Sequence, residues 1–438
     1  MIRTIDLRGQ TPTRSELIAL VPRADTDVSV ASEAAAALID AVREDGLVAL
    51  RDQAERFDRV VPEHVRVPQA DIDAAVAGLE PSVRAALDEA IVRVRQATAA
   101  QIPDARTTTL DDGAVVEQRW HPVERVGLYV PGGKAVYPSS VVMNVVPAQL
   151  AGVGSIAIAS PPQSEFGGSI HPTILGAAGL LGVTEVYAIG GAGAIGALAY
   201  GVDEIGLEAV QVITGPGNVF VAAAKRLVRG VVGIDSEAGP TEILIVADES
   251  ADPEFVAADL VSQAEHDELA AAVLVTDSEA LAQNVVAALS RVAAGTMHAE
   301  RVAVALDGPQ SAIVLVDSIE IAAAVSNVYG PEHLELQTVD PDATLAHIHN
   351  AGAIFLGAYS PVSLGDYLAG SNHVLPTGGQ SRFSSGLGAY TFLRPQQLIR
   401  YDRAALEAVA DRIVALSSAE NLPAHGDAVT ARFTRDAG

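Results

Sequence analysis

Four polar side chains that lie far apart in the chain could together hold a metal ion. Gln263 and His266 occur in VSQAEHDE, Asp366 in SLGDYLAGSNH and His425 in ENLPAHGDA. The first motif ends a helix predicted to open at Asp252-Pro253, a cap followed by proline, so Gln263 and His266 share one helical face. Histidine nitrogens with amide and carboxylate oxygens suit Zn²⁺, and Mn²⁺ is an alternative. Taken singly, each motif also fits a polar helix face, a helix cap or a histidine that complements a helix dipole.

A glutamate and a histidine, Glu332 and His333, stand side by side in YGPEHLEL, directly after a Gly-Pro turn. A turn allows two adjacent side chains to face one cavity, whereas a regular strand would point them to opposite faces. Glutamate and histidine commonly transfer protons in enzymes. The same pair is equally compatible with a surface turn before a strand in HLELQT. The chain has no cysteine, so neither a thiolate ligand nor a covalent thiol intermediate is available.

Composition limits the class of protein. The 438 residues are 49% hydrophobic, which predicts a folded chain with two to four domains. The formal net charge of −27 repels nucleic acid and anionic membranes, so we expect neither as a partner. The N-terminal residues lack an apolar signal core and no window reads as a membrane span. Together with the absence of cysteine, this predicts a cytoplasmic protein.

The order of apolar runs predicts an α/β fold. RVGLYV, SIAIAS, EVYAIG and VQVITG form a first set of strands, each followed by a turn and an alanine-rich helix. EILIVAD, AAAVLVTD, SAIVLVD and AGAIFLG form a second set. This alternation predicts two parallel sheets, one within residues 129–240 and one that uses residues 241–385. The stretch up to about Pro122 reads as helices that we expect to pack on the second unit, and the C-terminal tail reads as helical.

Glycine-rich turns give an ambiguous signal for a dinucleotide site. Residues 190–196, GGAGAIG, contain G-x-G-x-x-G between a strand and a helix, but the acidic residue expected about twenty positions later is missing. The turn Gly215-Pro216-Gly217-Asn218 opens another helix, where backbone N–H groups could meet a phosphate. A third loop, residues 129–134, ends in Lys134, which could supply positive charge.

Eight ordered sequence blocks together resemble the histidinol dehydrogenase family, and the resemblance spans nearly the whole chain. The blocks are LYVPGGKAVYPSSVVMNVVPA, GGAGAIGALAYG, GPGNVFVAAAKR, DSEAGPTEILIVAD, DLVSQAEHD, YGPEHLEL, GDYLAGSNHVLPTGGQSRFSSGL and ENLPAHGDAV. Eight blocks in order are far more specific than any single motif among them.

The resemblance implies a fold of two Rossmann-like parallel-sheet α/β domains, similar to aldehyde dehydrogenases, with small helical N- and C-terminal segments. It implies an N-terminal arm (1–24), a catalytic and metal-binding domain (25–128 with 241–385), an NAD-associated domain (129–240) and a C-terminal helical segment (386–438). Members of the family are homodimers with intertwined subunits. The resemblance therefore implies that the C-terminal segment completes the site of the partner subunit.

The resemblance also implies a reaction: oxidation of L-histidinol to L-histidine through L-histidinaldehyde, with two NAD⁺-dependent hydride transfers and one Zn²⁺ per subunit. Carried over to this chain, the zinc ligands are Gln263, His266, Asp366 and His425, and the acid–base residues are Glu332 and His333. Substrate contacts fall on Thr241, Gln263, His266, His333, Asp366, Glu420 and His425, with His373 nearby. NAD contacts fall on Tyr129 and Asn218.

Two positions depart from the family pattern. Gly193 stands where the family commonly has a glutamine that touches NAD, so one side-chain contact is lost. Thr241 stands where serine is frequent, and the hydroxyl is kept.

Because the chain has no cysteine, the aldehyde must be oxidised as its hydrate, with Glu332 activating the water and His333 accepting the proton. Three alternatives remain open from the sequence. A zinc hydrolase would use Glu332 as the base, but it leaves the two glycine-rich turns unexplained. A binding module with a structural metal leaves Glu332 and His333 without a role. A related dehydrogenase could act on another small alcohol.

Overall fold

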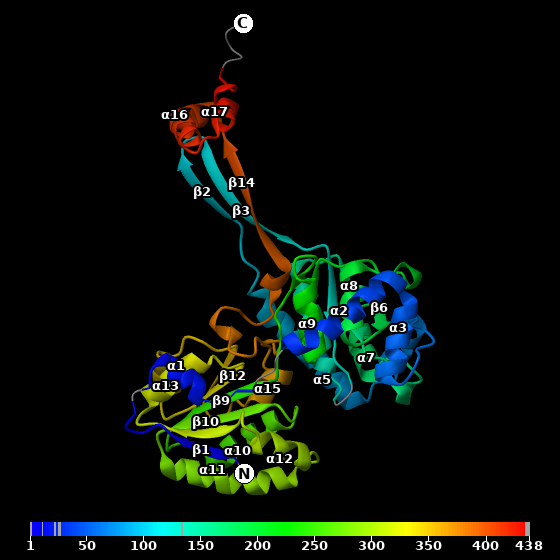
Figure 1. Ribbon diagram of the computed structural model, residues 1–438, viewed down its shortest axis with the longest axis vertical. Helices are drawn as coiled ribbons and strands as arrows, with labels where there is room; N and C mark the ends of the chain where they lie inside the picture. The colour runs from blue at the N-terminus through cyan, green and yellow to red at the C-terminus, as the bar shows by residue number, and fades with distance from the viewer. Residues whose placement is uncertain (1, 11, 22, 25–27, 133–134, 434–438) are drawn as a thin grey trace. The chain divides into compact units, whose positions relative to one another are not determined.

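The computed structural model describes residues 2–10, 12–21, 23–24, 28–132 and 135–433 (Figure 1). Lys134, which the sequence analysis singled out, lies outside these residues. Contacts divide the chain into two units, which are described separately. The larger unit comprises residues 1–101 and 123–392, and the smaller unit comprises residues 102–122 and 393–438.

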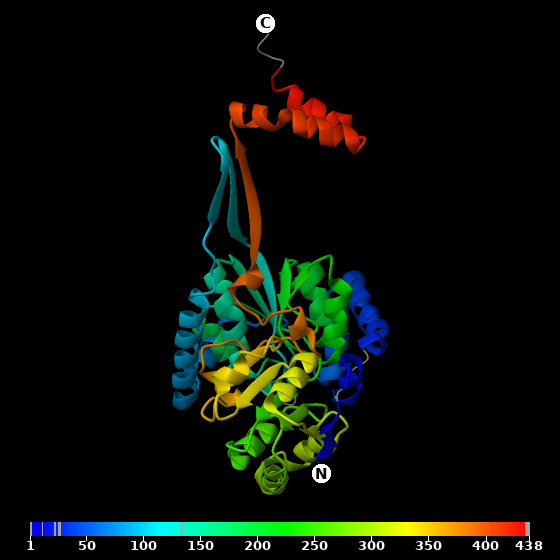
Figure 2. The ribbon, with the colours of Figure 1, turned by 90° about the vertical axis from the view of Figure 1, so that its left-hand side faces the viewer.

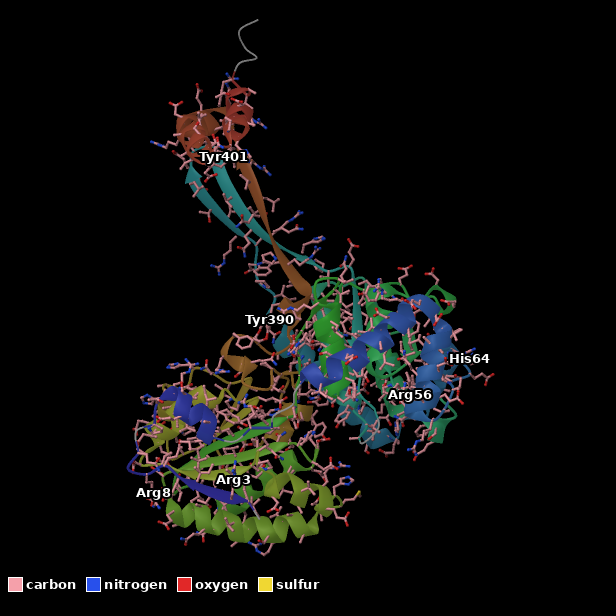
Figure 3. All side chains as sticks on the ribbon, viewed as in Figure 1. Arg3, Arg8, Arg56, His64, Tyr390 and Tyr401 are labelled. Carbon is pink, nitrogen blue, oxygen red and sulfur yellow. The ribbon has the colours of Figure 1, made fainter. Side chains whose placement is uncertain are left out.

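The larger unit contains a six-stranded parallel sheet in the order β1-β11-β10-β9-β12-β13. The strands are β1 (Arg3–Asp6), β9 (Glu242–Ala247), β10 (Ala271–Thr276), β11 (Ala312–Leu315), β12 (His333–Gln337) and β13 (Ala353–Leu356). Every side chain of β9 and β10 is buried, because parallel strands covered by helices on both faces need continuous apolar runs. Arg8, labelled in Figure 3, lies just after β1. It pairs with Asp6 at 2.7 Å and with Glu279 at 3.0 Å.

Helices cover both faces of this sheet (Figure 1). One face packs against α10 (Pro253–Ala264), α11 (Glu279–Gly295) and α12 (Ala299–Asp307). The other packs against α1 (Arg14–Leu20) and α13 (Ile319–Tyr329). The short helices α14 (Pro341–Leu345) and α15 (Val362–Tyr367) follow β12 and β13 in the chain. As predicted, α10 opens at Asp252, whose side chain accepts from the backbone N–H of Glu254, with proline in the first turn.

A second, five-stranded parallel sheet has the order β6-β5-β4-β7-β8. Its strands are β4 (Arg125–Tyr129), β5 (Ser155–Ser160), β6 (Glu185–Ala188), β7 (Val212–Thr214) and β8 (Gly233–Ile234). The connecting helices are α6 (Pro138–Ala151), α7 (Pro172–Leu180), α8 (Gly191–Tyr200) and α9 (Val219–Val228). The two sheets share one strand order. If β4 to β8, and likewise β9 to β13, are numbered one to five along the chain, each sheet has the order three, two, one, four, five. The six-stranded sheet has β1 as an additional edge strand. The prediction of an α/β fold with two parallel sheets is confirmed.

The early helices pack on helices of the five-stranded sheet, so the expectation that they pack on the second α/β unit is wrong. These helices are α2 (Val28–Asp45), α3 (Leu47–Gln53), α4 (Gln69–Ala77) and α5 (Pro81–Ala99). α2 packs on α8 and α9, α4 on α7, and α5 on α6. The small side chains of α8 allow this close approach: a Cβ at Gly196 would lie 3.2 Å from the Cα of Ile39. The functional domain boundaries given by the resemblance stay a prediction.

The smaller unit is an antiparallel ribbon with two helices (Figure 2). The ribbon order is β14-β3-β2, formed by β2 (Arg106–Asp111), β3 (Ala114–Pro122) and β14 (Leu393–Tyr401). Helices α16 (Arg403–Ala419) and α17 (Pro423–Thr430) follow β14 and pack on each other. All residues of β2 are exposed. The tail was predicted to be helical, whereas the ribbon was not predicted.

Short helical turns complete the described chain: η1 (Ala54–Asp58), η2 (Ser164–Phe166), η3 (Asp203–Ile205), η4 (Gln380–Arg382) and η5 (Ala389–Phe392). Over the described residues, no helix combines the length and apolarity needed to cross a membrane.

Candidate active site

The adjacent residues Glu332 and His333 lie at the amino end of the central strand β12, beside the amino end of its neighbour β9. β12 begins at His333, which is in register with Ile243 of β9. Both side chains are buried, with 6% and 5% exposed. The turn before them is formed by Gly330, whose φ of +61° ends α13 in the left-handed region that glycine favours. The surface-turn alternative for this motif is therefore wrong.

Hydrogen bonds fix the protonation pattern of His333. Its Nδ1 lies 3.0 Å from the backbone carbonyl of Glu242. Because a carbonyl oxygen only accepts, Nδ1 carries the proton and Nε2 holds the free lone pair in the neutral ring. Nε2 is buried and has no hydrogen-bond partner among the described residues. Burial lowers the pKa of His333. A neutral imidazole with a free Nε2 can accept a proton from a bound molecule.

Glu332 is held by two donors on the neighbouring strand. Its Oε2 accepts from Thr241 Oγ1 at 2.6 Å and from the backbone N–H of Glu242 at 2.9 Å. Burial raises the pKa of Glu332 to about 8, and the hydrogen bonds from Thr241 and Glu242 oppose that rise. A nearby cation would lower the pKa again, because it stabilises the carboxylate.

Gln263, the penultimate residue of α10, joins the same network. Its Nε2 donates to Thr241 Oγ1 at 2.6 Å. The side-chain oxygen Oε1 is buried and lacks a hydrogen-bond partner among the described residues. An amide oxygen buried without a partner is costly. Its orientation is therefore consistent with a ligand that this single chain does not contain.

His266, Asp366 and His373 face the same region as His333. Burial lowers the pKa of His266, the Asp366 carboxylate raises it, and His333 is a further electrostatic neighbour. His373 Nδ1 lies 2.9 Å from the Asp366 carbonyl, and its Nε2 lies 3.2 Å from Ser140 Oγ. The structure thus brings together predicted residues from α10, the start of β9, the start of β12 and α15.

The other two predicted residues belong to the smaller unit. Glu420 is the C-cap of α16, and His425 lies in α17. Both are exposed. Within the described ranges, no group of three or more histidine, cysteine, aspartate or glutamate side chains is arranged to hold a metal ion. His266 and Asp366 provide only two such groups, so the predicted four-ligand set requires the Gln263 amide oxygen and His425.

A carboxyl pair of the half-buried Asp259 and the buried Glu335, which the sequence analysis missed, links the elements that carry these residues. Asp259 of α10 hydrogen-bonds with Glu335 of β12. Glu335 Oε1 accepts from the backbone N–H of Val362, the first residue of α15, at 3.0 Å. Gln337 Nε2 donates to Glu335 at 3.0 Å and to Asp259 at 3.3 Å. Burial raises the pKa of Asp259 to about 6 and that of Glu335 well above its usual range. The contact between the two carboxyls therefore joins α10 to β12.

The predicted NAD residues lie at the carboxyl ends of two adjacent strands in the five-stranded sheet. Tyr129 ends β4, and its hydroxyl accepts from the backbone N–H of Gly191 at 3.1 Å. Asn218 follows β7 and caps α9, accepting from Phe220 at 3.0 Å and Val221 at 3.2 Å. The strand order reverses between β4 and β7, and open α/β sheets bind ligands in the crevice at such a switch point.

A buried ion pair fixes the Gly215–Asn218 turn beside Tyr129. Lys225 pairs with Asp235, donates to the Gly215 carbonyl at 2.9 Å, and is only 1% exposed. Asp235 in turn accepts from the backbone N–H of Gly215 at 2.8 Å. Gly215 has a φ of +112°, and a Cβ there would collide with the Tyr129 carbonyl. The turn therefore requires glycine at this position.

Gly193, the departure noted in the sequence, lies inside α8 beside a residue that sequence reasoning missed. A Cβ at Gly193 would collide with Oε1 of Gln53. Gln53 comes from α3, and its Nε2 donates to the Leu38 carbonyl at 3.0 Å. A side-chain amide from another helix thus occupies the space beside Gly193. No sequence motif marks Gln53.

The chain matches known proteins along its whole length. The family model for histidinol dehydrogenase matches residues 21–433. The histidinol dehydrogenase of Leifsonia xyli subsp. xyli is 70% identical over 432 residues, which cover 99% of both chains. That of Nocardia farcinica is 58% identical, covering 98% of this chain and 97% of the relative. The crystal structure of histidinol dehydrogenase from Elizabethkingia anophelis superimposes with a TM-score of 0.92 at 33% identity, covering 100% of this chain and 99% of that one.

Proposed function

Since the chain belongs to the histidinol dehydrogenase family, we propose that it oxidises L-histidinol to L-histidine, the last step of histidine biosynthesis. The proposed enzyme uses NAD⁺ as the oxidant and one Zn²⁺ per subunit. The observation that carries the proposal is the buried pair of Glu332 and His333, with the free His333 Nε2 and the free Gln263 Oε1 in one network.

The proposed zinc site consists of Gln263, His266, Asp366 and His425. Nitrogen and oxygen ligands suit Zn²⁺, and the orphaned oxygen of Gln263 supports its inclusion. When bound, the metal would act as a Lewis acid that orients the substrate. In this arrangement Thr241 has two tasks: it positions the Gln263 amide through one hydrogen bond and the Glu332 carboxyl through another.

In the first half-reaction, His333 Nε2 accepts the proton of the alcohol while the carbon loses a hydride to NAD⁺. The products are L-histidinaldehyde, NADH and a proton. The Nδ1 hydrogen bond to the Glu242 carbonyl stabilises the imidazolium that forms. The proton must then leave His333 before the second half-reaction begins.

In the second half-reaction, water adds to the aldehyde carbon to give a gem-diol. Glu332 in its carboxylate form takes a proton from that water and returns it to the former aldehyde oxygen. His333 then takes a proton from the diol as the second hydride leaves. The net products of this half are the carboxylic acid, a second NADH and a proton. The absence of cysteine supports a hydrated aldehyde rather than a thiohemiacetal.

The proposed NAD⁺ site lies at the switch point of the five-stranded sheet, with Tyr129 and Asn218 as its side chains. The glycine turn at residues 215–218 would present backbone N–H groups to the cofactor, and the Lys225–Asp235 pair keeps that turn in place. Backbone N–H groups at the start of a helix bind a pyrophosphate favourably. Their partial positive charge would offset the repulsion between this anion and the acidic chain.

We also propose a homodimer in which Glu420 and His425 complete the site of the partner subunit. Both side chains are exposed in the single chain. The smaller unit also exposes apolar side chains: Leu110 at 61%, Ile399 at 71% and Leu416 at 66%. A small unit that leaves such side chains exposed is a suitable interaction surface.

Absorbance of NADH with L-histidinol as substrate tests the proposal. We expect two NADH per histidinol consumed, loss of activity after prolonged chelation, and recovery on addition of Zn²⁺ or Mn²⁺. One NADH per substrate with free aldehyde accumulating would contradict the four-electron reaction. Reduction of NAD⁺ with another small alcohol, but not with histidinol, would favour a related dehydrogenase. Metal-dependent hydrolysis without NAD⁺ would favour a zinc hydrolase.

A further inference from the structure

An open cavity of about 430 Å³ lies between the N-terminal helix α1, the end of α13 and the loop that contains Gly378. One wall is apolar and includes Leu17, Val21 and Val328. The other wall carries the guanidinium groups of Arg23 and Arg382. A cavity of this size with one apolar and one charged wall can hold a small organic molecule.

Arg23 and Arg382 line this cavity, and Arg14 is a neighbouring charge of Arg382. Arg23 pairs with Glu242 at 3.4 Å and stacks over the Tyr329 ring at 4.1 Å. Burial lowers the pKa of Arg382, and the nearby cations Arg23 and Arg14 lower it further. In the part of the chain that the structure describes, neither Arg14 nor Arg382 has a carboxylate within ion-pair distance.

The two lining guanidiniums converge on one point of the backbone. A Cβ at Gly379 would lie 2.6 Å from Arg23 Nη1 and 3.1 Å from Arg382 Nη2. Arg382 Nε donates to the Gly379 carbonyl at 2.8 Å, which fixes the orientation of its guanidinium. Two oriented guanidiniums that approach one position leave several N–H donors for a single anion.

Among the described residues, Glu242 is the carboxyl that pairs with Arg23, and it offsets the arginine charges incompletely. Glu242 is 2% exposed, and burial raises its pKa to about 7. It therefore carries only part of a negative charge near neutral pH, against three arginine charges. A chain with a net charge of −27 nevertheless concentrates positive charge here. An anion that enters the cavity would remove this repulsion between cations.

We propose that this cavity binds the phosphate group of a small molecule, with Arg23 and Arg382 as the donors and the apolar wall against the body of that molecule. Planar guanidiniums bind phosphate oxygens through paired, charge-assisted hydrogen bonds. The volume exceeds what a lone phosphate needs, which favours a phosphate ester over the free ion.

Glu242 connects this cavity with the proposed active site. Its side chain accepts from the backbone N–H of Gly378 at 2.9 Å and pairs with Arg23. Its backbone N–H and carbonyl contact Glu332 and His333. The cavity is therefore one residue away from the catalytic pair, while its own lining includes neither member of that pair.

Isothermal titration calorimetry of the full chain tests the proposal without histidinol or NAD⁺, so its outcome is independent of the proposed function. The probes are phenyl phosphate, inorganic phosphate and benzoate. We expect saturable binding of phenyl phosphate, weaker binding of inorganic phosphate, and the weakest binding of benzoate. Arg382→Gln should weaken phenyl phosphate binding at least about tenfold, since it removes charge-assisted hydrogen bonds to the phosphate.

Arg51→Gln is the matched control, because Arg51 is an exposed arginine of α3 outside the cavity lining. It should leave the affinity unchanged. Arg14→Gln, on the exposed side of α1, should give a smaller loss than Arg382→Gln and guards against misfolding of a single variant. Absence of saturable binding to the parent protein, equal loss in Arg51→Gln and Arg382→Gln, or tighter binding of benzoate would overturn the proposal.

Discussion

His333 Nδ1 and the backbone carbonyl of Glu242 lie 3.0 Å apart, and this bond determines which nitrogen of His333 can act on a substrate. The carbonyl belongs to β9 and the imidazole to β12, two strands in direct register. The orientation of the proposed base is therefore set by the sheet rather than by a mobile loop. Positioning on rigid elements favours proton transfer in a defined direction.

Glu332→Gln should slow oxidation of L-histidinaldehyde much more than oxidation of L-histidinol to the aldehyde. The amide keeps the shape of the side chain but cannot take a proton from water, and loss of a general base costs about 10²–10⁴-fold in rate. Single-turnover measurements with each substrate separate the two halves. His333→Asn is the comparison, and it should slow both. Oxidation of the aldehyde by Glu332→Gln at the parent rate would contradict the role of Glu332.

Thr241→Val should destabilise the protein, whereas Thr241→Ser should have little effect. Valine removes the hydroxyl that donates to Glu332 and accepts from Gln263, leaving two buried polar groups without that partner. Such a loss costs about 1–3 kcal/mol per group. Denaturant unfolding measures the free energy, and kcat with histidinol should fall in parallel for Thr241→Val alone. Equal unfolding free energies and equal kcat values for the two variants would show that the hydrogen bonds of the Thr241 hydroxyl have no role.

The metal-free protein should lose stability as the pH rises from about 5 to 8. The pKa of Glu332 is raised from 4.5 to about 8 in the folded chain, so the folded state binds more protons than the unfolded state between these values. The free energy of unfolding therefore decreases with pH across this window. Glu332→Gln removes the titrating group, so its unfolding free energy should fall less steeply between pH 5 and pH 8. An identical slope for parent and variant would mean that Glu332 is ionised throughout.

Inactive subunits should complement each other if His425 acts in the site of the partner. His333→Ala and His425→Ala are unfolded together and refolded. In a mixed dimer one site then receives both lesions and the other receives neither. Random pairing makes half of the dimers mixed, so about a quarter of the parent activity should return. Each variant refolded alone should remain inactive. A verified mixed dimer without activity would place His425 in the site of its own subunit or remove it from the ligand set.

Most strands of both parallel sheets were predictable because they are continuous apolar runs between glycine or proline turns, whereas the edge strands β1 and β8 lack such a run and were not predicted. The runs EILIVA and AAVLVT became β9 and β10, buried along their whole length. β2 and β3 were not predictable in the same way. Their sequences, RTTTLD and AVVEQRWHP, are largely exposed or half-buried and lack a strong apolar pattern. Their pairing with β14 depends on residues from the other end of the chain.

The chemistry of the site was partly visible in the sequence. Gln263, His266, Glu332 and His333 stand in short motifs, so their residue types and spacing were sufficient to nominate them. Glu335 and Asp259 were missed. In HLELQT, Glu335 resembles a solvent-facing residue of a strand with one exposed face, and only the structure shows that every residue of β12 is buried. Gln53 was missed because its neighbour Gly193 is far away in sequence, and only the packing of α2 and α3 on α8 brings them together.

The pairing of β3 with β14 has a consequence for the order in which the chain can fold during synthesis. Arg119 and Gln396, which hydrogen-bond across these strands, are 277 positions apart. The strands β4 to β8 and their helices are contiguous in the chain, so they can assemble while later residues are still being made. The ribbon must wait for β14, which emerges near the end of translation. In the proposed homodimer, the C-terminal segments can therefore be exchanged only after β14 has been made, late in synthesis.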